Sequence, residues 1–534
     1  MITMASYRSP LATGSDGFGA LIRAEWTKFR TVRGWIIGLL VGMLFIVGLG
    51  VLTGSNSACS FQPNPNGPPQ ACPVPPTGPG GEWVSDSFYF VRQPLAGDGS
   101  ITVRVTSLTG LYSTHGGEAA GQNPTAGMTP GVQPWAKTGL IIKASTTEGS
   151  AYAAIMVTGS HGVRMQWNYT SDVAGLAGTV SAASPRWLRL TRSGDVIRGY
   201  DSADGTHWTL VGTAALAGLP PVSQAGLFTA TPGYTKNSTG LGTASSIGGG
   251  AQATGGFDQV SLQGGWPAGA ASRWTGDAIG ANSSVFGSLP ASAQGFTQAG
   301  GRFTVSGSGD IAPAPNAGET AQSTLTGVFA GLIAAVVVGV MFMTAEYRRG
   351  LISTTFAASP RRGRVLAAKA VVLGAVTFVA GLIAAAITVP LGEHLLRENG
   401  NPIYPMSQLT EARVIVGTAA LLAVATVLAL AVGALVRRSA GAVTAVIAVV
   451  ILPFLLATLV GVLPAAAEQW LVRVTPAAAF AIQQSIPAYP QVDAAYTPGT
   501  GYFPLAPWAG FAVLCAWAAA ALALAVFVLR RRDV

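Results

Sequence analysis

Six long apolar stretches limit this chain to a membrane-spanning fold. They run over residues 35–54, 323–345, 367–390, 412–436, 439–461 and 506–529. A helix needs about 20 residues to cross the hydrocarbon core of a bilayer, and each stretch reaches about that length. None shows the alternation of a membrane barrel strand. The sequence therefore predicts a polytopic α-helical membrane protein with six transmembrane helices, in keeping with a charged content of only 10%.

Positive charge gathers beside these stretches, and its placement predicts their orientation. The clusters are Arg23, Lys28, Arg30 and Arg33; Arg348, Arg349, Arg361, Arg362 and Arg364; Arg437 and Arg438; and Arg530, Arg531 and Arg532. If every stretch spans, all four clusters fall on one side, which the positive-inside rule makes cytoplasmic. We expect a multi-pass plasma-membrane protein with both termini inside and residues 55–322 outside. The alternative is a cleaved signal peptide at residues 35–54, although that run is longer than a usual signal core. The excess positive charge behind the net +9 lies beside the apolar stretches, where the membrane explains it, so no nucleic-acid partner is expected.

The segment between the first two stretches has a different character. Residues 55–322 carry twelve Lys and Arg against thirteen Asp and Glu. This segment begins with a Pro/Gly-rich linker at 55–82 and ends with a second linker at 310–322. Its apolar residues alternate with period two, and "RWLRLTRSGDVIRGYDSADGTHWTLVG" (186–212) indicates three strands joined by turns. We predict a large all-β extracellular sandwich over 83–309, inserted between the first two transmembrane helices. Residues 264–309 either complete it or form a small addition. Cys59 and Cys72 are either a disulfide or two free thiols.

The strands of this insert resemble concanavalin A-like (lectin/glucanase, jelly-roll) modules of bacterial glycosidases. The resemblance rests on "KTGLIIKAS", "AYAAIMVT" and "WLRLTRSGDVIRGYDSADGTHW", and covers roughly residues 83–263. It implies an extracellular glycan or protein as ligand. Four aromatic residues are candidates for stacking on sugar rings, or alternatively belong to the core: Trp135, Trp167, Tyr169 and Trp208. Asp201 and Asp204 are read as turn caps, with Ca²⁺ binding or glycoside hydrolysis as alternatives. No catalytic or metal-binding motif stands out, so no catalytic residue, metal or cofactor is assigned to this chain.

The sequence contains no phosphate-binding loop, because no Lys follows a Gly. Ionisable residues are also scarce in the spans, which disfavours an ion-coupled transporter. An external ATPase would therefore have to drive any transport. Within residues 1–34, apolar residues from Phe18 to Phe29 recur at helical spacing, which predicts an amphipathic interfacial helix in contact with membrane lipid. The plainer alternative is a basic flank that only sets topology.

The cytoplasmic connection "AEYRRGLISTTFAASPRRGRVLAAKAVV", together with "RAEWTKFRTVRGW", resembles permease subunits of ABC-2 type exporters from actinobacteria. The resemblance makes 35–54 and 323–534 one permease domain. It implies a separate ABC ATPase subunit, which would hold ATP and Mg²⁺, and a second permease copy in a dimer. It also implies that two regions couple to the ATPase: Glu25, Trp26, Lys28, Arg30 and Arg33, then Glu346, Tyr347, Arg348, Arg349, Arg361, Arg362 and Arg364. The large insert is a departure from these relatives.

Three functions remain open at this point. The first is the permease subunit of an ATP-driven exporter, for which lipid-like, peptide and drug cargoes fit the apolar spans equally well. The second is a membrane-anchored carbohydrate-binding receptor or sensor without transport, which leaves six organised spans unexplained. The third is a membrane glycosidase, which lacks a recognisable catalytic pair.

Overall fold

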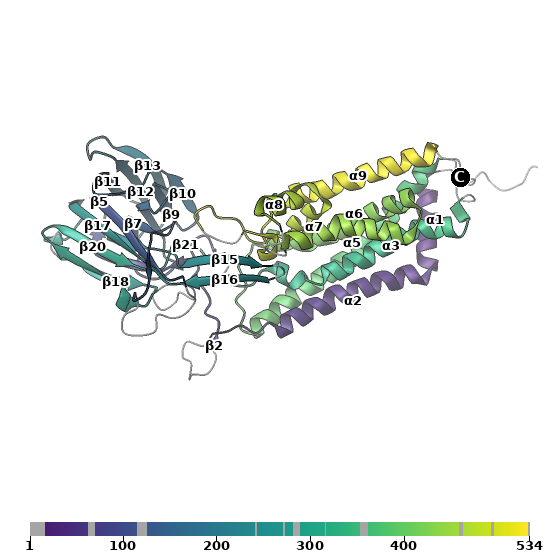
Figure 1. The fold of residues 1–534 in the computed structure, drawn as a ribbon, viewed down its shortest axis with the longest axis horizontal. Helices are drawn as coiled ribbons and strands as arrows, with labels where there is room; N and C mark the ends of the chain where they lie inside the picture. The colour runs from purple at the N-terminus through teal and green to yellow at the C-terminus, as the bar shows by residue number, and fades with distance from the viewer. Residues whose placement is uncertain are drawn as a thin grey trace, which may run out of the picture.

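A helical bundle and a β-sandwich lie end to end in this chain (Figure 1). The computed structural model describes residues 17–61, 70–114, 125–240, 243–270, 273–280, 289–315, 317–352, 361–458, 463–492 and 496–531. In chain order, the strands of the sandwich follow helix α2 (Arg33–Asn56) and precede helix α3 (Val328–Arg348).

The helices of the bundle match the apolar stretches. Besides α2 and α3, four helices in the described residues are long and apolar enough to cross a membrane: α5 (Arg362–Glu398), α6 (Gln408–Val436), α7 (Ser439–Thr458) and α9 (Pro507–Arg531). The shorter elements are α1 (Phe18–Thr31), α8 (Ala465–Val474), and the 3-10 helices η2 (Ala291–Ala293), η3 (Ala321–Leu325), η4 (Pro476–Gln483) and η5 (Pro498–Thr500). Each predicted stretch coincides with one long helix, so the prediction of six apolar helices is confirmed.

Two helix bounds differ from the expectation. Helix α5 has 37 residues and continues past Pro390 to Glu398, where Arg397 pairs with Glu393 one turn earlier at 2.8 Å. Helix α3 begins at Val328 rather than near 323, because the chain first makes the buried 3-10 turn of η3.

Helix α6 is the centre of the bundle. It packs against α3, α5, α7 and α9. In its most apolar 18-residue stretch, 67% of the residues are buried, against 22% in the corresponding stretches of α2 and α9. Close approach depends on small residues: a Cβ added to Gly339 of α3 would lie 2.7 Å from the carbonyl oxygen of Thr426 in α6. Because α2 and α9 expose apolar side chains along their length, the rim of the bundle is suited to lipid or to another protein.

The inserted domain is built from two antiparallel sheets. The seven-stranded sheet has the order β10-β9-β8-β7-β14-β4-β18, and the eight-stranded sheet has the order β13-β12-β11-β5-β17-β20-β19, with β6 paired to β5. The strands of the first sheet are β4 (Phe88–Ala96), β7 (Lys137–Lys143), β8 (Tyr152–Thr158), β9 (Val163–Trp167), β10 (Ser171–Ala174), β14 (Val222–Ala230) and β18 (Thr275–Ile279). The second contains β5 (Gly99–Tyr112), β6 (Thr129–Pro130), β11 (Arg186–Ser193), β12 (Val196–Ser202), β13 (Thr209–Ala215), β17 (Ala251–Gly264), β19 (Gly295–Ala299) and β20 (Arg302–Gly307).

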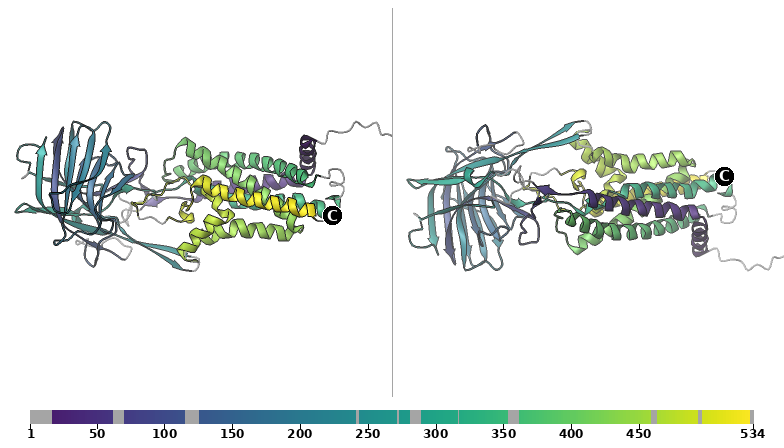
Figure 2. Two further views of the ribbon diagram at one scale, coloured as in Figure 1. Left: turned by 90° about the horizontal axis from the view of Figure 1, so that it is seen from above. Right: turned by 90° about the horizontal axis from the view of Figure 1, so that it is seen from below.

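Residues 264–309 complete the sandwich rather than forming an addition. Strand β18 extends the seven-stranded sheet beside β4, while β20 pairs with β17 in the other sheet. The remaining pairs are β1 (Ser60–Phe61) with β2 (Gln70–Ala71), β3 (Val84–Asp86) with β21 (Ile311–Pro313), and the hairpin β15 (Tyr234–Gly240) with β16 (Thr243–Gly249). The hairpin reaches from the sandwich toward the helical bundle (Figures 1 and 2).

Both faces of the seven-stranded sheet are buried. One face meets the other sheet in the main core, through residues such as Val91, Leu140 and Ile155. The opposite face carries a second apolar cluster that includes Phe90 and Phe228. This explains why β7 and β8 are buried at every position, as in a sheet covered on both sides.

The two linkers of the insert enter and leave the sandwich side by side. Strands β3 and β21 pair with each other, so residues 311–313 of the predicted linker 310–322 are part of the folded domain. Buried lysines at the two ends of β7 hold both ends of the inserted domain: Lys143 Nζ lies 2.7 Å from Asp86 of β3, and Lys137 Nζ lies 2.6 Å from Asp310 beside β21. Because a buried charge is tolerated only when paired, these contacts determine where the linkers dock.

The sandwich also contacts the loops at the near end of the bundle. Trp83 packs edge-on against Tyr404, with Ile486 and Tyr502 in the same buried cluster. Gln491 Nε2 donates to the carbonyl oxygens of residues 169 and 170, each at 3.1 Å. Just beyond α2, Cys59 and Cys72 form a disulfide.

Candidate functional site

Helix α1 lies across the end of the bundle that is remote from the sandwich (Figure 2). The extended residue Val32 separates it from α2, ending one helix and beginning the next. Leu21 and Phe29 face the bundle, and Phe29 contacts Phe342 of α3 with ring centroids 6.4 Å apart. The amphipathic pattern thus places α1 against the ends of α3 and α5.

Glu25 lies on this apolar face, between Leu21 and Phe29, and is only 3% exposed. Its carboxylate enters a closed ring of four ionic contacts that joins three helices, which we call the ion ring: Glu25 and Lys28 of α1, Glu346 of α3 and Lys369 of α5. Lys28 Nζ lies 3.1 Å from Glu25 and 3.0 Å from Glu346. Lys369 Nζ lies 2.8 Å from Glu25 and 2.5 Å from Glu346.

The members of the ion ring differ in exposure. The Lys369 side chain is 1% exposed and packs over the Phe342 ring at 5.0 Å, whereas the Lys28 side chain is 43% exposed. Burial lowers the pKa of Lys28, but Glu25 and Glu346 outweigh that effect and leave its pKa raised. The second oxygen of Glu346, Oε2, is buried and has no protein partner in the described part of the chain. The ring is charge-balanced and stiff, with one unfilled acceptor.

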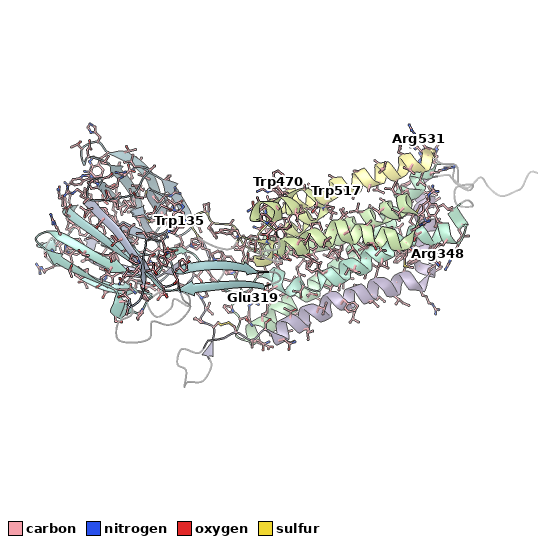
Figure 3. All side chains as sticks on the ribbon, viewed as in Figure 1. Trp135, Glu319, Arg348, Trp470, Trp517 and Arg531 are labelled. Atoms are coloured by element: carbon pink, nitrogen blue, oxygen red, sulfur yellow. A yellow bond between two sulfur atoms is a disulfide. The ribbon has the colours of Figure 1, made fainter. Side chains whose placement is uncertain are left out.

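The other predicted coupling residues surround the ion ring without joining it. Five arginines and one tryptophan are exposed at this end: Trp26, Arg30, Arg33, Arg348, Arg349 and Arg361. Arg364 is also exposed, and Arg348 lies at the end of the bundle far from Glu319 and the sandwich (Figure 3). Arg362 donates to the carbonyl oxygen of Leu529 at 2.6 Å, and Tyr347 stacks with Arg437 at 5.1 Å. Their role as ATPase-coupling residues stays a prediction.

Sequence reasoning did not assign Lys369 to this site. It belongs to the apolar run 367–390, and its partner Glu25 is 344 residues away. A signal was nevertheless present: Glu25 interrupts the apolar face of an amphipathic helix, and a carboxylate there requires a buried cation.

Two of the four candidate sugar-stacking residues belong to the core, the alternative that the sequence left open. Trp135 is 3% exposed and stacks on His161 with ring centroids 3.9 Å apart. Tyr169 is fully buried, and its hydroxyl donates to Asp86 at 2.8 Å. Trp167 is half-buried and packs against the main core. Trp208 lines a surface hollow.

The capping prediction is confirmed for Asp204, which accepts from the backbone N–H groups of Thr206 and His207 in its own turn. It is wrong for Asp201, which is buried in β12 and accepts from the backbone N–H of Leu176, 25 residues earlier. Among the described residues, no group of three or more His, Cys, Asp or Glu side chains could hold a metal ion.

Comparison with known proteins decides the class of the chain. The family described as ABC-2 family transporter protein matches residues 211–534, more than half of the chain. The chain belongs to this family. It is therefore a multi-pass membrane component of an ABC transporter, and family membership implies an ABC ATPase partner and a dimeric assembly.

Other comparisons add no functional assignment. Among curated proteins, none matches the chain. Among solved structures, a functionally unknown protein from Saccharomyces cerevisiae is 16% identical with a TM-score of 0.21, covering 40% of this chain and 95% of that one. Scytalido-glutamic peptidase is 11% identical with a TM-score of 0.24, covering 42% and 98%. Likenesses this low support no conclusion, and the concanavalin A-like assignment stays a prediction.

Proposed function

We propose that this chain is the permease subunit of an ATP-driven exporter, and that the ion ring couples it to a separate ATPase. The end of the bundle that carries α1 faces the cytoplasm in this proposal, and the sandwich faces outside. The arginines at that end support the orientation, because positive residues beside spans stay on the cytoplasmic side.

The ATPase would dock on the exposed surface formed by α1 and by the connection between α3 and α5. Exposed arginines there offer fixed positive charge, and Trp26 offers an apolar anchor. A displacement of α1 would then reach α3 and α5 through the ion ring, since Lys28 of α1 contacts Glu346 of α3 and Glu25 of α1 contacts Lys369 of α5. The ion ring is the single observation that supports coupling at this place.

Co-purification tests the docking surface directly. Changing Arg348, Arg349, Arg361 and Arg364 to Gln should leave membrane insertion unchanged but abolish retention of an ATPase encoded beside this chain. A control with Arg198 and Arg302 of the sandwich changed to Gln should retain it. Retention of the ATPase by both variants would contradict the docking assignment.

The inserted sandwich gives this proposed exporter a recognition domain outside the cell. Its attachment through β3, β21 and the contacts of Gln491 supports a fixed position above the outer end of the bundle. We assign this domain a binding role rather than a catalytic one, because Asp201 is buried and accepts from the backbone of Leu176, and Asp204 accepts within its own turn.

A further inference from the structure

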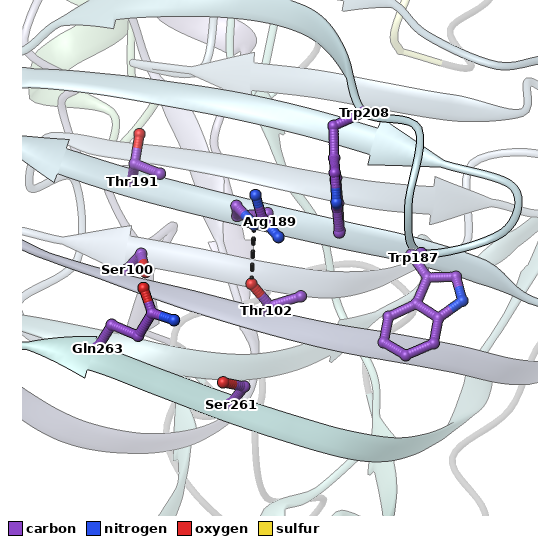
Figure 4. A pocket seen from close by; sticks show the side chains of 9 residues that line it. Ser100, Thr102, Trp187, Arg189, Thr191, Trp208, Ser261 and Gln263 are labelled. Carbon is purple, nitrogen blue, oxygen red and sulfur yellow. Dashed lines mark hydrogen bonds between the residues drawn. The ribbon is translucent and has the colours of Figure 1, made fainter.

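The outer face of the eight-stranded sheet contains a hollow of about 350 Å³, which we call the sheet groove (Figure 4). Its lining includes two indole rings, one guanidinium and a row of hydroxyl and amide groups: Trp187, Trp208, Arg189, Ser100, Thr102 and Gln263. Its volume falls within the range of about 300–1,000 Å³ that is common for small-ligand sites.

Strand register brings these side chains together. Arg189 of β11 lies opposite Thr102 of β5, and Thr102 lies opposite Ser261 of β17. Leu188 and Leu190 are fully buried in the main core. Because side chains alternate along a strand, Arg189 therefore faces outward with its neighbours in the groove.

The guanidinium of Arg189 lies over the Trp208 ring, and only one of its nitrogens donates a hydrogen bond to a described residue. Its Cζ lies 3.9 Å from the centroid of the Trp208 ring, and its Nε donates to Thr102 Oγ1 at 3.0 Å. Within the described residues its two Nη groups have no protein partner. A guanidinium carries five N–H donors in a rigid fork, so the remaining donors stay available for an acceptor of matching geometry.

No carboxylate among the residues lining the groove competes for Arg189. The nearby Asp258 is bound through both oxygens to Arg104, at 2.7 Å each. Asp204 accepts from its own turn and from His207. The sheet groove therefore presents an uncompensated positive charge.

Trp187 lies at the same end of the groove as Trp208 (Figure 4). The turn at Gly205 packs directly on its indole, since a Cβ there would lie 2.7 Å from the ring. Gly205 also has φ +79°, so both its backbone and its lack of a side chain fix this contact. The two indoles thus lie on one side of Arg189, and the polar row continues on its other side (Figure 4).

We propose that the sheet groove binds an acidic saccharide. The apolar face of a sugar ring would lie against the indoles, its hydroxyl groups would bond to the polar row, and a carboxylate would meet the fork of Arg189. This deepens the proposed recognition role of the outer domain, and it rests on the proposed function only for placing the groove outside the cell.

Binding of tetragalacturonate to the detergent-solubilised full chain tests the proposal, with tryptophan fluorescence as readout. The matched ligand is the fully methyl-esterified tetrasaccharide, which has the same rings without charge. We expect the acid to bind at least tenfold more tightly than the ester. Equal affinity for the two ligands, or no binding of the acid, would overturn the assignment.

Two variants locate the site. Arg189→Gln should weaken binding of the acid about tenfold and leave binding of the ester unchanged, whereas Trp208→Ala should weaken binding of both ligands. Arg302→Gln, at an exposed arginine on strand β20 that does not line the groove, is the control and should change neither. An unchanged affinity in Arg189→Gln would refute the site. Because no ATPase is present, failure of the coupling proposal leaves these measurements unaffected, and the converse also holds.

Discussion

Removing the buried cation of the ion ring should destabilise the bundle more than removing the exposed one. Lys369→Met leaves Glu25 and Glu346 sharing only Lys28, which is 43% exposed. Breaking a buried pair by removing one partner costs roughly 3–5 kcal/mol, and the remaining lysine favours the lower value. For a helical part of about 200 residues, 1 kcal/mol shifts Tm by about 2–4 °C. We therefore expect the Tm of Lys369→Met to fall by roughly 6–12 °C.

The chain contains its own probe for this experiment. Cys515 in α9 is a free thiol, whereas Cys59 and Cys72 are joined in a disulfide. A maleimide dye that fluoresces on reaction therefore reports unfolding of the bundle at Cys515, separately from unfolding of the sandwich. The purified full chain is heated in detergent, and the midpoint of the rise is taken as Tm.

Two variants provide the controls. Lys28→Met removes a contact to the same two carboxylates, but an exposed pair contributes only about 0–1 kcal/mol, so Tm should fall by less than about 4 °C. Adding Glu25→Gln and Glu346→Gln to Lys369→Met should restore more than half of the loss, because no charge is then left buried. Equal shifts for the two lysine variants, or a lower Tm for the triple variant than for Lys369→Met, would refute the reasoning.

Three further predictions concern the sandwich and the orientation. Burial and the charge of Asp86 raise the pKa of Tyr169, so the stability that its protonated hydroxyl contributes is complete below pH 10 and is lost above it. In urea unfolding, the stability of the domain should fall between pH 10 and 11 by about 1 kcal/mol less in Tyr169→Phe than in the unaltered protein. The bond to Asp204 raises the pKa of His207, and NMR titration of Asp204→Asn should show a return toward the usual value. In intact cells, an impermeant maleimide should label Ser184→Cys but not Arg349→Cys, and the reverse pattern would contradict the proposed orientation.

Hydropathy and local turn chemistry were sufficient for much of the fold. Apolar length alone predicts the six long helices, because the bilayer requires it. The sequence "RSGD" predicts the β11–β12 hairpin, whose strands pair from Ser193 with Val196 onward. These signals depend on residues close in sequence, where spacing and conformation are directly linked.

The sites required information that spacing does not contain. Period two assigns Trp135 and Tyr169 to sheet faces, but it cannot show that another layer covers a face. The second core includes Val84 and Ile311, which come from the two ends of the inserted domain. The pairing of Lys369 with Glu25 spans 344 residues. The sheet groove likewise combines strands β5, β11 and β17, whose register only the folded sheet defines.

The pairing of β3 with β21 has a consequence for how such a chain can evolve. A domain whose first and last strands are neighbours occupies little more room at its attachment point than a short loop would. The six spans can thus gain or lose the whole outer module without any helix changing its position. The sandwich and the membrane helices can therefore diversify independently within one polypeptide.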